Sequence, residues 1–133
     1  VLLYGLTDKV VFHGFVSGEG LTALFEQTHV GVGSFGMHRI GVADGQTSTL
    51  KAREYAARGL PIVLGHQDRG FPGDFPYLLE LPAVESPVNI QQIVDFYLNV
   101  QLSNYPQEMN AYAEQRLTWF VNFKPVVNAY RKP

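Results

Sequence analysis

Cysteine is absent from the 133 residues of this chain. Its absence excludes disulfide bonds and thiolate metal sites, and it is typical of a reducing compartment, so we expect a cytoplasmic protein. Long hydrophobic runs are also missing, because no stretch approaches the roughly 18 apolar residues of a membrane span. The net charge of −2 provides no basic surplus, and we therefore expect no nucleic acid as a partner.

What the chain does contain is the composition of a folded domain. Apolar residues make up 46% of it and charged residues 17%, which argues against disorder. A length of 133 residues is enough for a single domain with its own core. The first five residues resemble the end of a helix already under way, and they predict that the chain is a fragment of a longer protein.

Short strand-like runs and helical periodicities alternate along the sequence. Strands are predicted at residues 10–14, 29–34, 61–64 and 77–81. Helices are predicted at residues 19–28, 50–58 and 89–100, followed beyond Pro106 by a helical stretch that breaks at Pro125. This alternation predicts an α/β fold with a parallel sheet, in which ligands bind outside the carboxyl ends of the strands.

The helix predicted at residues 50–58 has clear signals at both ends. A hydroxyl of the Thr47-Ser48-Thr49 cluster can cap its start, and Gly59 stops it before Leu60-Pro61 leads into the next strand. The first backbone N–H groups of a helix have no partner within it, so its start is a favourable place for an anionic group. Glu54 lies five residues before the glycine, on the same helix.

These residues form a motif that resembles the signature of the group 1 nucleotide-sugar glycosyltransferases of the B fold. The matching pattern is Lys51-x-x-Glu54-Tyr55-x-Ala57-x-Gly59-x-Pro61. Two predicted strands are similar to that family as well, namely Val10-x-Phe12-x-Gly14 and Val30-Gly31-Val32-Gly33-Ser34. The resemblance covers residues 10–63 well and the C-terminal helices loosely.

The resemblance implies a Rossmann-like sheet with flanking helices, the C-terminal half of a B-fold transferase. Residues 1–104 would be its α/β nucleotide-sugar-binding part, and residues 105–133 would be helices that cross back towards the other domain. The acceptor-binding domain and the basic residues that grip the diphosphate would lie upstream. The fragment alone would therefore be inactive.

Roles for individual residues also follow from the resemblance. It implies that Glu54 binds the ribose hydroxyls, although a surface ion pair with Arg58, worth about 0.3–0.5 kcal/mol, is the alternative. The remaining implied substrate-binding residues surround the diphosphate, the sugar and the nucleobase. They are Thr49, Leu50, Lys51, Ser48 and Gln46 near the helix start, and Gly14, Phe15 and Val16 after the first strand. Phe15 could equally be a core aromatic.

One position departs from the family pattern. Many members carry a further glutamate eight residues before the ribose-binding one, and here that position is Gln46. Asp44 could substitute for it, and the retaining or inverting outcome stays open. His38-Arg39, in the glycine-rich loop predicted before Gln46, could reach a phosphate or could form an exposed pair. His13, His29 and His66 lack metal spacing, so we predict no metal site, and no catalytic residue can be named.

The implied activity is transfer of a sugar from a nucleotide diphosphate donor to a hydroxyl of a glycan or lipid-linked acceptor, with no other cofactor. A nucleotide-sugar epimerase of the same architecture and a non-enzymatic protein-interaction module are the alternatives. The aromatic C-terminal residues could pack on the core or be exposed, in which case we expect self-association of the fragment. Whether the parent protein is membrane-associated stays open.

Overall fold

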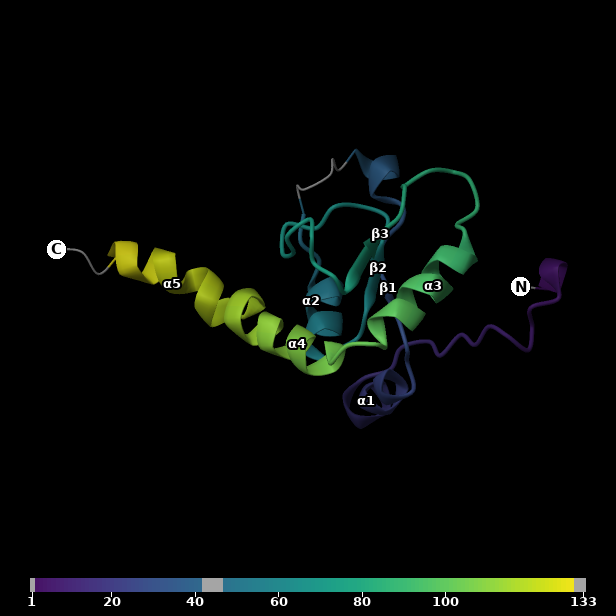
Figure 1. Ribbon diagram of the computed structural model, residues 1–133, viewed down its shortest axis with the longest axis horizontal. Coiled ribbons are helices and arrows are strands. Elements are labelled where there is room, and N and C mark those ends of the chain that lie inside the picture. Colours follow the sequence, from purple (N-terminus) through teal and green to yellow (C-terminus); the bar gives the residue numbers. More distant parts are fainter. Residues whose placement is uncertain (1, 42–46, 131–133) are drawn as a thin grey trace.

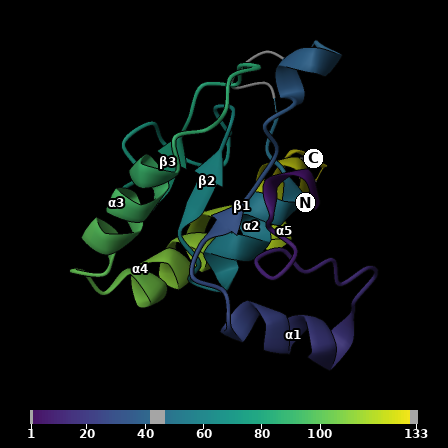
Figure 2. The same ribbon diagram turned by 90° about the vertical axis from the view of Figure 1, so that its right-hand side faces the viewer.

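A computed structural model describes residues 2–41 and 47–130. Its centre is a small sheet of three parallel strands, β1 (Gly31–Val32), β2 (Ile62–Leu64) and β3 (Leu78–Glu80), in the spatial order β1-β2-β3. Gly31 pairs with Ile62, and Ile62 pairs with Leu78. Figures 1 and 2 show the strands running towards the same edge, with α1 (Gly18–Glu26) at the opposite end. The predicted α/β class with a parallel sheet is confirmed, although the strands are short.

The helices between and after the strands match the predicted positions closely. The helix between β1 and β2 is α2 (Leu50–Ala57), and α3 (Ile90–Val100) follows β3 after an Asn89 cap. Two single-turn 3-10 helices complete the described elements of this part, η1 (Leu2–Tyr4) and η2 (Met37–Ile40). The C-terminal part consists of α4 (Tyr105–Tyr112), the π-helical turn η3 (Ala113–Leu117) and α5 (Trp119–Tyr130).

One glycine in β1 and one directly after it allow α2 and β2 to approach this segment closely. A Cβ on Gly31 would lie 2.4 Å from Cδ2 of Tyr55 on α2, and a Cβ on Gly33 would lie 2.2 Å from Cδ2 of Leu64. Neither position can hold a larger side chain without displacement of its neighbour. The prediction that the small residues at 29–34 serve close packing in a parallel sheet is therefore confirmed.

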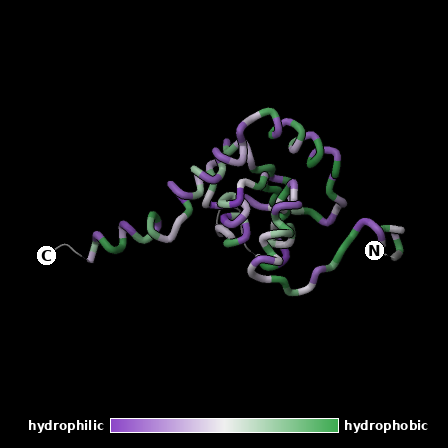
Figure 3. The backbone as a smooth tube through the Cα atoms, turned by 90° about the horizontal axis from the view of Figure 1, so that it is seen from below, coloured by the Kyte–Doolittle hydropathy of each residue, from purple (hydrophilic) through white to green (hydrophobic). Residues whose placement is uncertain are grey.

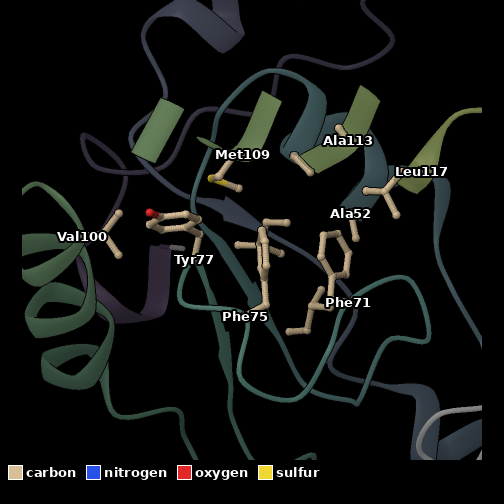
Figure 4. Packing of buried hydrophobic residues seen from close by; sticks show 11 residues of the cluster. Ala52, Phe71, Phe75, Tyr77, Val100, Met109, Ala113 and Leu117 are labelled. Atoms are coloured by element: carbon tan, nitrogen blue, oxygen red, sulfur yellow. The ribbon is translucent and has the colours of Figure 1, made fainter. Parts of the chain in front are cut away.

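The core lies between the sheet, α2 and the first C-terminal helices. Ala52 and Ala56 of α2 are fully buried and face Met109 and Ala113, and Figure 4 shows this packing together with three aromatic side chains. The alanines matter because their small side chains let α2 lie flat between β2 and α4. Gly59, directly after α2, allows Pro106 of α4 to approach the backbone closely. Its φ of 69° is a conformation that favours glycine.

The loop after β2 contributes aromatic residues to the same core. The ring centroids of Phe75 and Tyr112 are 4.6 Å apart, and those of Phe71 and Phe75 are 5.1 Å apart. The hydroxyl of Tyr112 donates to the carbonyl of Gly70 at 2.8 Å. Glu108 of α4 accepts a hydrogen bond from Tyr77, which raises the pKa of that phenol. The loop is thereby fixed to α4 instead of extending into solvent.

The strand predicted at residues 10–14 is wrong. These residues form no strand, and Val11 and Phe12 are exposed. Apolar and β-branched side chains favour a strand, but a strand is stable only when a neighbouring strand satisfies its backbone. The described residues provide no such partner, so this segment runs beside the domain as an extended arm (Figure 1).

The helix break predicted at Pro125 is also wrong. The chain leaves the helical conformation at Thr118, with φ −67° and ψ 150°, and α5 then continues through Pro125. Pro125 lies seven residues into the sequence of α5, so it removes one hydrogen bond within the helix without ending it. Figures 1 and 3 show α5 projecting away from the rest of the molecule.

Candidate functional site

Two segments meet at the carboxyl ends of the strands. The amide of Gly65, directly after β2, donates to the carbonyl of Ser34, directly after β1, at 3.1 Å. The same carbonyl lies 3.2 Å from Nδ1 of His66, whose ring is buried. The Nε2 atom of His66 has no hydrogen-bond partner among the described residues. The ring of His66 is therefore held at the strand tips through Nδ1.

The buried carboxylate of Asp68 anchors the start of α2. Its Oδ2 accepts a hydrogen bond from the amide of Thr49 at 3.0 Å, and its Oδ1 accepts one from Gly70 at 2.8 Å. A further bond from the amide of Arg69 to the carbonyl of Thr47 joins the same two segments. Asp68 thus holds the loop after β2 against the beginning of the helix.

Thr49 caps α2 as predicted. Its hydroxyl accepts the amide hydrogen of Ala52 at 3.2 Å, and its own amide donates to Asp68. Two of the backbone amides at this helix start, those of Thr49 and Ala52, therefore already donate to groups of the protein and are not open to an anionic ligand. Leu50 and Lys51 form the exposed first turn, beyond the cap.

A groove of about 250 Å³ lies between α2 and the C-terminal helices. One wall comes from α2 and the other from α4, η3 and the start of α5. The groove is lined by apolar side chains together with two carboxylates, an arginine, an amide and a hydroxyl. Its lining residues are Leu50, Arg53, Glu54, Ala57, Asn110, Ala113, Glu114, Leu117, Thr118 and Trp119.

Glu54 faces this groove, which also reaches Leu50 at the start of the helix. Its side chain is 45% exposed, and Oε1 accepts a hydrogen bond from Nε of Arg58 at 3.2 Å. The i,i+4 ion pair considered for this residue is therefore formed, and the carboxylate remains accessible from the groove. Arg58 in turn lies over the ring of Phe25, 4.2 Å from its centroid.

Arg53 connects the two walls of the groove. Its Nε donates to Oγ of Ser48 at 3.1 Å, and its Nη1 donates to the carbonyl of Leu117 at 3.1 Å. Leu117 ends the π-helical turn, where a backbone carbonyl lacks a helical partner. π-helical turns are rare and frequently occur at functional sites. Ser48 therefore supports Arg53 in this structure.

The residues expected to hold the nucleobase lie elsewhere. Gly14, Phe15 and Val16 precede α1, at the end of the molecule opposite the strand tips in Figures 1 and 2. Phe15 is 96% exposed and so is not a core aromatic either. The structure does not bring this segment together with Glu54. Gln46 and Asp44 lie outside the described residues.

His38 and Arg39 are joined to Glu85, in the loop after β3. Arg39 contacts the carboxylate with Nε at 2.9 Å and Nη2 at 2.5 Å, and Nε2 of His38 lies 3.1 Å from Oε1. The hydrogen bonds from Arg39 and then His38 lower the pKa of Glu85 to about 2. In this arrangement the two basic side chains are occupied by a protein carboxylate.

Sequence reasoning missed Asp68 and Arg53 as organisers of the site. The Asp68-x-Gly70 spacing is typical of a turn in which the aspartate accepts an amide two residues on, and that signal could have identified it. Nothing in the sequence points to Arg53, because its partner Leu117 is 64 residues away.

Comparison with known protein families, with curated proteins and with solved structures found no match. Within residues 2–41 and 47–130, no helix combines the length and apolar character needed to cross a bilayer. The same part of the chain holds no group of three or more His, Asp or Glu side chains placed to bind a metal ion.

Proposed function

We propose that this chain is the donor-binding part of a glycosyltransferase that uses a nucleotide diphosphate sugar. The ribose would bind in the groove between α2 and the π-helical turn, with Glu54 accepting hydrogen bonds from its hydroxyls. The sugar would pass to a hydroxyl of a glycan or lipid-linked acceptor. On this proposal the acceptor-binding half belongs to a longer chain, and these 133 residues bind the donor weakly and transfer nothing.

The observation that carries the proposal is the position of Glu54. Its carboxylate lies one turn beyond the start of α2, is 45% exposed, and lines the same groove as Leu50. An exposed carboxylate held by a single surface ion pair can exchange that partner for two ligand hydroxyls at little cost. Charge-assisted hydrogen bonds of this kind are about twice as strong as neutral ones.

The diphosphate has a suitable neighbourhood at the first turn of α2. The helix dipole favours negative charge there, and Lys51 is exposed beside it. Asp68 occupies the amide of Thr49, so the proposal assigns the diphosphate to the amides of Leu50 and Lys51 rather than to the cap itself. Charge that develops on the leaving diphosphate would be stabilised by the same groups.

Calorimetric titration with UDP-, GDP- and ADP-sugars tests this assignment on the complete enzyme. We expect Glu54→Gln to weaken binding of the preferred donor by about 10- to 100-fold, because hydrogen bonds to a charged group are lost. A donor that lacks the ribose 2′-hydroxyl should bind weakly to the native protein and be less sensitive to the substitution.

Glu114→Gln is the matched control, since Glu114 is an exposed carboxylate on the opposite wall of the groove. Its donor affinity should stay close to that of the native protein. Equal losses in both variants would indicate a general charge effect, and unchanged affinity in Glu54→Gln would remove the ribose assignment.

A further inference from the structure

The projecting helix α5 carries a continuous apolar face. At about 100° per residue, six large apolar side chains fall within an arc of about 120°. They are Trp119, Phe120, Phe123, Val126, Val127 and Tyr130. Lys124 lies beside this arc, and Pro125 and Asn128 lie on the other side of the helix.

All six side chains are exposed in the structure, from 43% for Val127 to 88% for Tyr130. No residue of α5 is buried, and Figures 1 and 3 show the helix running away from the sheet and its covering helices. A stripe of large apolar residues on a solvent-exposed helix marks an interaction surface.

Charge is divided unevenly between this end of the chain and the rest. Residues 115–133 contain Arg116, Lys124, Arg131 and Lys132 and no acidic residue. Since the net charge of the whole chain is −2, the remaining residues carry −6. The apolar stripe is therefore placed in the basic segment of an acidic protein.

We infer that α5 binds the surface of an anionic lipid bilayer, lying in the interface with its apolar face among the acyl chains. α5 has aromatic residues on one side and Lys124 beside them, and Arg116, Arg131 and Lys132 flank the helix in the sequence, a combination suited to this environment. Lysines and arginines near the bilayer surface strengthen binding through attraction to anionic lipids. The inference does not depend on nucleotide binding in the groove.

Helix stability supports a lipid surface as the occupant. A helix of 12 residues with no buried residue is marginal in water, and Pro125 weakens it further. The surface of a bilayer would stabilise this helix, because lipid covers its apolar face and favours a hydrogen-bonded helical backbone. Antiparallel pairing of two α5 helices would instead bring their two Lys124 side chains together near the helix centre, at an electrostatic cost.

The experiment uses Trp119, the chain's sole tryptophan, as the reporter. Vesicles of phosphatidylcholine mixed with phosphatidylglycerol should shift its fluorescence to shorter wavelength and raise the helical circular dichroism signal. Pure phosphatidylcholine vesicles should produce a much weaker effect. The effect of the anionic vesicles should decrease with added salt.

Two variants separate the apolar from the basic contribution. Phe123→Ser should weaken vesicle binding at least ten-fold, and Lys124→Gln about five-fold. Matched changes in the exposed N-terminal arm, Phe12→Ser and Lys9→Gln, should leave binding unchanged. None of these four residues lines the groove.

Several results would overturn the inference. They are an unchanged Trp119 spectrum with anionic vesicles, an equal response to neutral vesicles, or equal losses in the arm variants. Light scattering that shows a dimer abolished by Phe123→Ser, together with no vesicle binding, would assign the surface to a second copy of the chain. A response to an oligonucleotide but not to vesicles would assign it to nucleic acid.

Discussion

The amide of Thr49 and the amide of Gly70 both donate to the carboxylate of Asp68, which is 1% exposed. A buried carboxylate is stable only when its oxygens accept hydrogen bonds, and these two amides supply them. Asp68 thereby joins the start of α2 to the loop after β2 and helps to set the position of the groove behind the helix start.

Substitution of Asp68 by alanine should lower the free energy of unfolding by about 2–4 kcal/mol, since it leaves two inward-facing amides without an acceptor. Urea denaturation followed by circular dichroism measures the change. Asp74→Ala, in the same loop but exposed, should change it by less than about 0.5 kcal/mol. If both variants unfold at the same urea concentration, Asp68 is not the anchor.

Individual residues of the site could be predicted where a local signal exists. Short-range patterns predict the threonine cap of α2, the terminating Gly59 and the position of Glu54 on that helix, and the structure has each in place. Arg53 could not be predicted, because its role depends on a carbonyl that only the folded chain brings near. Glu85 was missed for the same reason.

The contact between η2 and the loop after β3 depends on the ionisation of Glu85, which binds His38 and Arg39 of η2. The pKa of Glu85 lies at about 2, below its ordinary value of 4.5, because Arg39 and then His38 donate hydrogen bonds to the carboxylate. A carboxyl group whose pKa is lowered in the folded protein contributes its full stabilisation at pH values above its pKa in the unfolded chain. That contribution is lost as the pH falls from about 4.5 through about 2.

An NMR titration of the Glu85 side-chain carboxyl carbon should therefore show a midpoint near pH 2 in the native protein. Arg39→Gln should move the midpoint back towards 4.5, because the strongest donor to the carboxylate is removed. A native midpoint close to 4.5 would mean that the contact between η2 and this loop does not persist in solution.

Element prediction succeeded where the signal is local and failed where a partner is required. Helices α2 and α3 have caps and periodicity in their own sequence. The run at residues 10–14 has strand propensity but no neighbouring strand in the described chain, so it remains extended. Pro125 is tolerated within α5, and the break occurs at Thr118, a residue without a breaker signal.

At the scale of the whole molecule, a compact centre carries two projecting segments. The centre consists of the sheet, α2, the loop after β2 and the start of the C-terminal helices. The N-terminal arm and α5 extend from it, and both expose large apolar side chains (Figure 1). The α/β class could be predicted from alternating patterns, whereas the placement of these two segments could not, because it depends on contacts rather than on propensity.

The central claim is that a nucleotide binds in the groove that Glu54 and Leu50 line. Titration of the isotope-labelled chain with the nucleoside diphosphates UDP, GDP and ADP, followed by amide chemical shifts, tests it directly. The claim predicts shifts that concentrate on the first two turns of α2 and on η3, and that vanish in Glu54→Gln. Shifts confined to α1 or the N-terminal arm, or no shifts at millimolar nucleotide, would contradict it.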